Sequence, residues 1–371
     1  PAAPADEVAD ALRSMDESHD PYEHYTAEQK KNHVKPGRWV KMNKIGQGAF
    51  GLVYKGVSTI TGGFMAIKEQ TFQKDEVGEI KALMREVQLM KRLTHKNLVC
   101  YYGAEILIEE TKLYIFQEWA AGGSIAGLLE KFGGSFPQED MIRKYTAETL
   151  EGLIFLHNHE DTWTSETTEQ QKQRPKVIHR DIKPDNILVD ANGSVKLADF
   201  GASKSMNMNA TATVDNKGSM AGTPYFMAPE AIDSDTFGKC GRRSDVWSVG
   251  GFVFQMIVGR PPWKALKMKS PYQLFARITR STRETPMDVD PPRDDITPEL
   301  TDFLNSCFIH DPESRPHSHE LKKHVWLKSD EEEDGEDDGN MDTMVGLTEL
   351  KRRASQERGS VHAELDKDED E

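Results

Sequence analysis

The sequence predicts an α+β protein with a small sheet-rich lobe followed by a larger helical lobe. Apolar residues alternate as in strands between residues 40 and 67, and they recur three and four apart from Ile80 to Met90. Helical patterns dominate from Gly122 onward. The chain has 371 residues, more than one compact core usually holds, so two lobes are expected.

The lobes form a body of residues 38–329, because apolar residues become frequent at Trp39 and scarce after Leu327. Residues 1–37 are polar and are expected to be a mostly flexible extension. Residues 330–371 hold 17 acidic and 5 basic side chains, which predicts a disordered acidic tail. Since the chain begins with Pro1 and not Met, we expect a piece of a longer polypeptide or a processed chain.

Composition excludes several classes of protein. The net charge of −15 lies in the two ends, so the body is near neutral and is not expected to bind nucleic acid. The longest apolar stretch, residues 247–258, is too short to span a membrane. The first ten residues lack a signal-peptide pattern, and three widely spaced cysteines predict neither a disulfide framework nor a zinc site.

The elements follow in order along the body. In the first lobe, residues 38–119, strands are expected near 40–45, 52–54, 64–67, 99–108 and 113–118, with a helix over 80–90. In the second lobe, residues 120–329, the spacing of Met141, Tyr145, Leu150 and Ile154 predicts a long helix, and short strands are expected near 187–197. Residues 160–175 form an unpatterned polar insertion, interpreted as a surface loop.

Three glycines, Gly46, Gly48 and Gly51, fall in the turn between the first two strands. Glycine lets backbone amides approach phosphate oxygens without a Cβ in between. The turn alone is equally compatible with an ordinary hairpin. It does not open a helix, which disfavours a dinucleotide site.

Lys68 closes the apolar strand 17 residues after Gly51 and could hold a phosphate as a point charge. Glu86, in the helix that follows, offers it a partner. Taken singly, a strand-end lysine and a glutamate on a helix are also ordinary solvated residues.

The second lobe contains the run His179-Arg180-Asp181-Ile182-Lys183-Pro184-Asp185-Asn186, and then Asp199-Phe200-Gly201. Asp181, Asn186 and Asp199 carry the hard oxygen atoms that Mg²⁺ prefers. Ala228-Pro229-Glu230 follows 27 residues after Gly201. The fixed order and spacing of these pieces point to one functional site.

With these motifs, residues 38–329 resemble the eukaryotic protein kinase family. The resemblance implies a bilobal protein kinase fold that binds ATP and Mg²⁺ between its lobes and transfers the γ-phosphoryl group to a protein. Met65, where the family usually has Val, is a small departure. No catalytic position is replaced, which disfavours the alternative of a kinase-fold scaffold with negligible turnover.

The resemblance also implies roles for single residues. Lys68 would hold the α- and β-phosphates and pair with Glu86; Asp181 would accept the substrate hydroxyl proton, with Lys183 beside the γ-phosphate; Asn186 and Asp199 would hold Mg²⁺. The ATP site would be lined by Ile45, Gly46, Gly48, Gly51, Val53, Ala66, Gln117, Glu118, Ala120 and Leu188, with Gln117 as gatekeeper and residues 118–120 as hinge.

Lys183 and Thr223 are typical of serine/threonine kinases. Residues 195–204 and 222–230 are most similar to the mitogen-activated protein kinase kinase kinases of the STE group. Pro184-Asp185 departs from their usual Gly-Ala, and p21-activated and germinal-centre-type kinases remain alternatives. The resemblance implies a MAP kinase kinase as protein substrate, an upstream activator or scaffold, and a cytoplasmic location.

Regulatory and structural residues are implied as well. Ser219 has the spacing of an activating phosphosite, and its phosphate would face Arg180. Asp245 is expected to anchor the catalytic loop. Arg315 is expected to form a buried ion pair with Glu230, whose disruption would leave a stranded charge.

Overall fold

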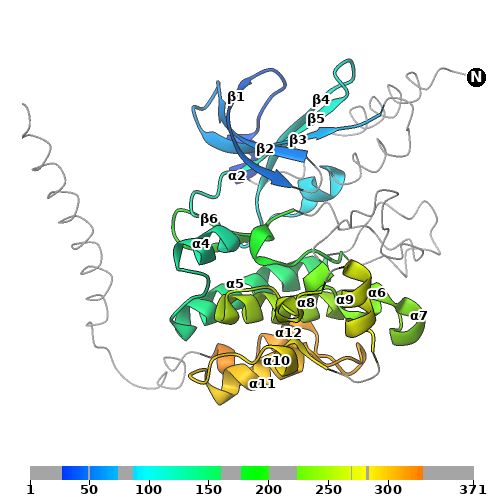
Figure 1. Cartoon of the computed structure of the whole chain (residues 1–371). Coiled ribbons are helices and arrows are strands. Elements are labelled where there is room, and N and C mark those ends of the chain that lie inside the picture. The colour runs from blue at the N-terminus through cyan, green and yellow to red at the C-terminus, as the bar shows by residue number, and fades with distance from the viewer. Residues whose placement is uncertain are drawn as a thin grey trace, which may run out of the picture. The chain divides into compact units, whose positions relative to one another are not determined.

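The computed structural model describes residues 27–48, 51–73, 87–159, 177–199, 224–268, 270–280 and 284–328. A sheet-rich part comes first and a helical part second (Figure 1), so the predicted α+β class is confirmed. The insertion at 160–175 and the acidic tail at 330–371 lie outside the described residues. No helix in the described ranges is long and apolar enough to cross a membrane.

The first lobe is built on a five-stranded antiparallel sheet with the order β1-β2-β3-β5-β4. Its strands are β1 (Trp39–Gly48), β2 (Gly51–Ser58), β3 (Phe64–Thr71), β4 (Tyr101–Leu107) and β5 (Lys112–Glu118). Residues 87–92 form a helix between β3 and β4. The predicted strands are all present, and β3 continues past its apolar run to Thr71.

Strand register decides which side chains share a face of this sheet. Lys68 lies opposite Val53 of β2 and opposite Ile115 of β5, while Ala66 lies opposite Gln117. Because directly paired residues project to the same side, these five side chains occupy one face.

The second lobe is mainly helical, with a small antiparallel sheet at its start. Its principal helices are α4 (Ile125–Lys131), α5 (Glu139–Asn158), α8 (Arg242–Val258), α9 (Pro271–Ile278) and α11 (Pro298–Cys307). Shorter helices are α6 (Pro229–Ile232), α7 (Ser234–Phe237), α10 (Pro286–Val289) and α12 (Ser318–Leu321). The small sheet contains β6 (Gly123–Ser124), β7 (Ile187–Val189) and β8 (Val195–Leu197).

Helices α5 and α8 are central to the core. In α8 nearly every side chain from Ser244 to Ile257 is buried, as expected for a helix that is covered on all sides. The long helix predicted over residues 141–154 is present as α5. It buries Tyr145 and Leu150 of the predicted pattern, while Met141 and Ile154 at its two ends are only partly buried and their neighbours Ile142 and Leu153 are fully buried.

The stretch before Trp39, expected to be mostly flexible, differs from that expectation over residues 27–37. It contains α2 (Ala27–Asn32), which contacts β4. Gln29 is fully buried and Val34 is 1% exposed. Residues 1–26 lie outside the described part of the chain.

Candidate active site

The glycine turn joins β1 to β2, where Gly48 pairs with Gly51. Residues 49–50 between them lie outside the described residues. Gly51 has a φ of +148°, and a Cβ there would lie 2.0 Å from the carbonyl oxygen of Glu69 in β3. Only glycine therefore fits at position 51, because β3 passes directly against its backbone.

Lys68 contacts Asp199 across the junction of the two lobes. Its Nζ lies 2.5 Å from Asp199 Oδ1, and Lys68 is 7% exposed. Burial raises the pKa of Asp199, but the Lys68 charge and hydrogen bond, together with the nearby charges of His179 and Lys183, bring the net pKa below its usual value. Asp199 is thus held as a carboxylate. Glu86, the partner expected for Lys68, lies outside the described residues.

A second cluster forms around Asp181. Its Oδ2 accepts hydrogen bonds from Lys183 Nζ at 2.8 Å and from Asn186 Nδ2 at 2.7 Å. Asn186 Nδ2 also donates to the Asp181 carbonyl oxygen, because the 3-10 turn η3 (Pro184–Asn186) folds back on the preceding residues. The Asn186 carbonyl oxygen accepts from Ala198 N, which connects this cluster to the residue before Asp199.

These positions suit a magnesium ion. Asn186 uses its amide nitrogen toward Asp181, which leaves the side-chain oxygen as the atom that could coordinate a cation. Together with the Asp199 carboxylate it provides hard oxygen ligands, and Mg²⁺ typically takes only one or two protein oxygens besides phosphates and water. Among the described residues there is no group of three His, Cys, Asp or Glu side chains that could form an all-protein metal site.

Asp245, on α8, holds the backbone of the Asp181 segment in place. Its Oδ2 accepts from His179 N at 2.9 Å and its Oδ1 from Arg180 N at 2.8 Å. His157 Nε2 lies 2.8 Å from Oδ2. Burial raises the pKa of Asp245, but the His157 hydrogen bond and the nearby charges together lower it by more. The net pKa therefore lies below the usual value, and this fully buried carboxylate stays ionised.

The backbone of this segment is strained at Arg180, whose φ is +67°. A long side chain rarely adopts this left-handed conformation, and the two hydrogen bonds to Asp245 stabilise it. The Arg180 guanidinium Nε is buried and has no hydrogen-bond partner within the described ranges. Ser219 and Thr223, the other regulatory candidates, lie outside those ranges.

The expected hinge begins at Glu118, whose side chain turns away from the sheet face bearing Lys68. Its carboxylate accepts from Cys100 N at 3.1 Å and lies 2.8 Å from Lys196 Nζ. Gln117, one residue earlier, donates from Nε2 to Met90 Sδ of the 87–92 helix at 3.6 Å. Ala120 is 5% exposed, and Ile45, in the second half of β1, is 39% exposed. Leu188 lies in β7, opposite Ser124.

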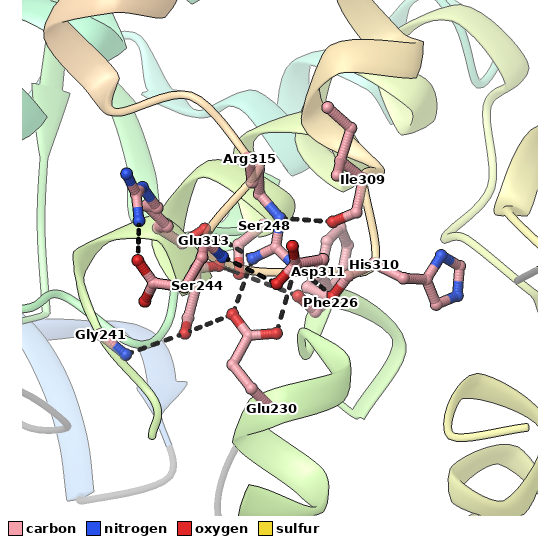
Figure 2. A network of polar contacts seen from close by, with 11 residues as sticks. Phe226, Glu230, Gly241, Ser244, Ser248, Ile309, His310, Asp311, Glu313 and Arg315 are labelled. Carbon is pink, nitrogen blue, oxygen red and sulfur yellow. Dashed lines mark hydrogen bonds and ion pairs between the residues drawn. The ribbon is translucent and has the colours of Figure 1, made fainter. Parts of the chain in front are cut away.

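Arg315 and Glu230 form a buried bidentate pair (Figure 2). Arg315 Nη1 lies 2.7 Å from Glu230 Oε1, and both side chains are 0% exposed. Ser244 donates a further hydrogen bond to Glu230, and Arg315 Nε donates to the Ile309 carbonyl. The guanidinium also lies over the ring of Trp247, 5.2 Å from its centroid.

Two residues that stabilise this region were not predicted from the sequence. His157 was assigned no role, although it bonds to Asp245 in the core. Lys196 was not singled out, although it pairs with Glu118. His157 is 88 residues from Asp245, and Lys196 is 78 residues from Glu118, so no local sequence pattern predicts these contacts.

A strand-rich lobe over a helical lobe, with Lys68 and Asp199 meeting between them, has the two-lobed architecture of protein kinases. The chain belongs to the protein kinase domain family, whose family model matches residues 39–327.

Relatives with curated names share this domain. Mitogen-activated protein kinase kinase kinase 3 of Arabidopsis thaliana is 40% identical over 304 residues, 80% of this chain and 42% of the relative. Mitogen-activated protein kinase kinase kinase 2 of the same plant is 38% identical over 313 residues, 82% of this chain and 42% of the relative. Mitogen-activated protein kinase kinase kinase 1 of Homo sapiens is 33% identical over 296 residues. The chain thus spans less than half the length of these relatives.

Proposed function

We propose that this chain is a serine/threonine protein kinase that transfers the γ-phosphoryl group of ATP to a MAP kinase kinase, and so acts as a MAP kinase kinase kinase. The convergence of Lys68, Asp199 and the Asp181–Lys183–Asn186 cluster carries the proposal. The names of the relatives support the cascade assignment.

Asp181 is the group that would receive a proton from the substrate hydroxyl. Lys183 and Asn186 fix one of its carboxylate oxygens by two hydrogen bonds, so the carboxylate is oriented before the substrate arrives. Lys183 also brings a positive charge next to Asp181. We assign this charge to stabilising the phosphoryl group during transfer.

Lys68 and the metal-holding pair would position the nucleotide. Lys68 projects from the same sheet face as Val53 and Ala66, which we assign to the adenine site. Asn186 and Asp199 would hold Mg²⁺, which supplies positive charge to the phosphate oxygens when bound. Because phosphoryl transfer needs mainly charge stabilisation and alignment, these fixed cations and carboxylates are the kind of groups that the proposed reaction requires.

The proposed domain is residues 38–329, divided into lobes at 38–119 and 120–329. We further propose a cytoplasmic protein that works with an upstream activator or a scaffold. We also propose that phosphorylation of Ser219 activates the chain, since the Arg180 guanidinium has a buried Nε without a hydrogen-bond partner in the described structure. Ser219→Ala should then remove the activation that follows incubation with ATP. Unchanged activity of this variant after phosphatase treatment and re-incubation would contradict the proposal.

The function is tested by incubating the chain with Mg-ATP and an inactive MAP kinase kinase, and mapping new phosphates by mass spectrometry. Phosphate on serine or threonine of the substrate's activation loop is expected, and Asp199→Asn should abolish it. Asp185→Asn is a matched control, because it makes the same change at an exposed aspartate in the turn next to Asn186. Transfer only to generic substrates would favour another STE-group kinase. ATP binding without transfer would favour a scaffold.

A further inference from the structure

Residues 27–37, called here the N-terminal strap, lie before the matched family region yet belong to the core of the first lobe. Val34 is 1% exposed, and its backbone N donates to the Tyr102 carbonyl oxygen of β4 at 2.9 Å. Its side chain joins a buried cluster on the sheet face opposite Lys68, which contains Met65, Ile67, Cys100, Tyr102, Tyr114 and Phe116. In Figure 1, α2 lies beside this sheet.

Strand β4 is shaped to receive the strap. Gly103 has a φ of +148°, and the register of β4 against β5 shifts between Tyr101 and Gly103. A Cβ at position 103 would lie 2.9 Å from the Val34 carbonyl oxygen and 3.4 Å from the His33 ring. The bulge and the glycine therefore make room for the strap backbone.

The strap also contacts the end of the 87–92 helix. Gln29 is 0% exposed and donates from Nε2 to the Lys91 carbonyl oxygen at 3.4 Å. The last carbonyls of a helix lack partners within the helix, so a buried amide at this point caps them.

The other end of the strap is fixed to the sheet. Glu105 Oε2 accepts from Gly37 N at 3.0 Å and from Trp39 Nε1 at 2.6 Å. Trp39 begins β1, which leads to the glycine turn. The strap is thus held at both ends and in its middle.

The capped helix connects the strap to the nucleotide site. Val87 and Met90 are buried in the main core, and Met90 Sδ accepts from Gln117 at the end of β5. Glu86, the partner expected for Lys68, directly precedes Val87 in the sequence. A shift of this helix would therefore move Met90 relative to Gln117, which lies on the same sheet face as Lys68.

We infer that the N-terminal strap is a positioning element of the nucleotide site, which fixes the 87–92 helix through the Gln29 cap and is itself fixed to β4 at Val34. The inference rests on the proposed kinase function for its effect on activity. Its structural part, the coupling of strap and helix, is independent of that function.

The test uses Gln29→Met in the full chain, which keeps the volume of the side chain but removes the amide donor. Lys31→Ala is the matched control, because Lys31 is exposed in the same helix. Backbone hydrogen exchange at residues 87–93 should become about 5-fold faster in Gln29→Met, the effect of one lost hydrogen bond. The ratio kcat/KM for ATP should fall about 3- to 10-fold, and Lys31→Ala should match the wild type.

A second variant, Val34→Ala, weakens the packing of the strap against β4. Because the strap carries Gln29, this variant should also speed backbone hydrogen exchange at residues 87–93. Unchanged exchange there in both variants would overturn the inference. So would faster exchange spread evenly over the sheet, since it indicates a role in stability alone. If the wild-type chain transfers no phosphate, the proposed function fails, and the exchange rates still decide whether the strap positions the helix.

Discussion

Glu118 and Lys196 join the two lobes behind the expected hinge, with Lys196 Nζ 2.8 Å from Glu118 Oε1. Glu118 ends β5 of the large sheet, and Lys196 lies in β8, three residues before Asp199. Their side chains are only 15% and 13% exposed, so solvent screens this pair less than a surface pair. The contact therefore ties the hinge to the segment that carries Asp199.

We expect this pair to contribute measurably to stability. Glu118→Gln and Lys196→Met should each lower the free energy of unfolding, and a double-mutant cycle should give a coupling of about 0.5–2 kcal/mol. Urea denaturation of the four proteins measures it. The pair of Lys96 with Glu151, in which Lys96 is 72% exposed, is the control, where a coupling of about 0.5 kcal/mol or less is expected. Equal coupling at the two sites would contradict the prediction.

The buried Glu230–Arg315 pair should be far more sensitive. Glu230→Gln leaves the Arg315 guanidinium buried without its counter-charge and should cost about 3–5 kcal/mol of unfolding free energy. Arg243 pairs with Glu313 nearby, but Glu313 is 87% exposed in that contact, so Glu313→Gln should cost less than about 1 kcal/mol. Chemical denaturation compares the two. A Glu230→Gln protein as stable as Glu313→Gln would show that the ion pair is dispensable.

Acid should destabilise the fold through its histidines. Burial is the main cause that lowers the pKa of His179, His33, His95 and His317 below the ordinary value of 6.5. The unfolded chain then binds more protons than the folded one just below pH 6.5. These histidines do not reduce the free energy of unfolding above pH 6.5. They reduce it as the pH falls from 6.5 toward their lowered pKa values in the folded chain.

Urea denaturation at pH 7.5, 6.5 and 5.5 measures this effect. Asp199, Asp245 and Glu151 have lowered pKa values. They therefore become protonated only at pH values below the range measured, and they do not affect the comparison. His33→Gln should show a shallower loss of stability toward acid, because it removes one of the titrating groups. Equal stability of the wild type at all three pH values would refute the prediction.

Close packing at Gly152 gives a further prediction. A Cβ at this position of α5 would lie 2.6 Å from Leu197 Cδ1 and 2.8 Å from the Asn97 carbonyl oxygen. Gly152→Ala should therefore destabilise the chain by about 1–3 kcal/mol, although alanine favours helices. Gly127→Ala in α4 is the control: its nearest neighbour is Ser124 Oγ at 3.6 Å, and about 0.5–1 kcal/mol of stabilisation is expected. The two melting temperatures should shift in opposite directions.

The arrangement of strands and helices was accessible from sequence because it follows periodicity and turn residues. Alternating apolar residues located all five strands of the large sheet, and the pattern around Tyr145 located α5. The buried face of α5 also includes Thr146 and Thr149, which the pattern omitted because it counted only apolar residues. Lys68, Asp181 and Asp199 were found through motif spacing.

The polar contacts that hold the site could not be found in the same way. The partners of Glu118 and Asp245 are fixed by tertiary packing, which leaves no mark at short sequence distance. The N-terminal strap escaped for a related reason. Gln29 is a polar residue that is buried because a helix end needs its amide, and composition alone assigns such a residue to the surface.

Gly103 has a practical consequence for domain exchange. A chimeric kinase whose grafted domain began at Trp39, the first residue of the matched region, would contain Gly103 of β4 but lack the strap backbone that packs against it. The apolar face around Tyr102 and Phe116 would then be uncovered in the hybrid, inviting insoluble product or capture of a foreign peptide. Grafts that retain residues 27–38 together with Gly103 keep both sides of this contact.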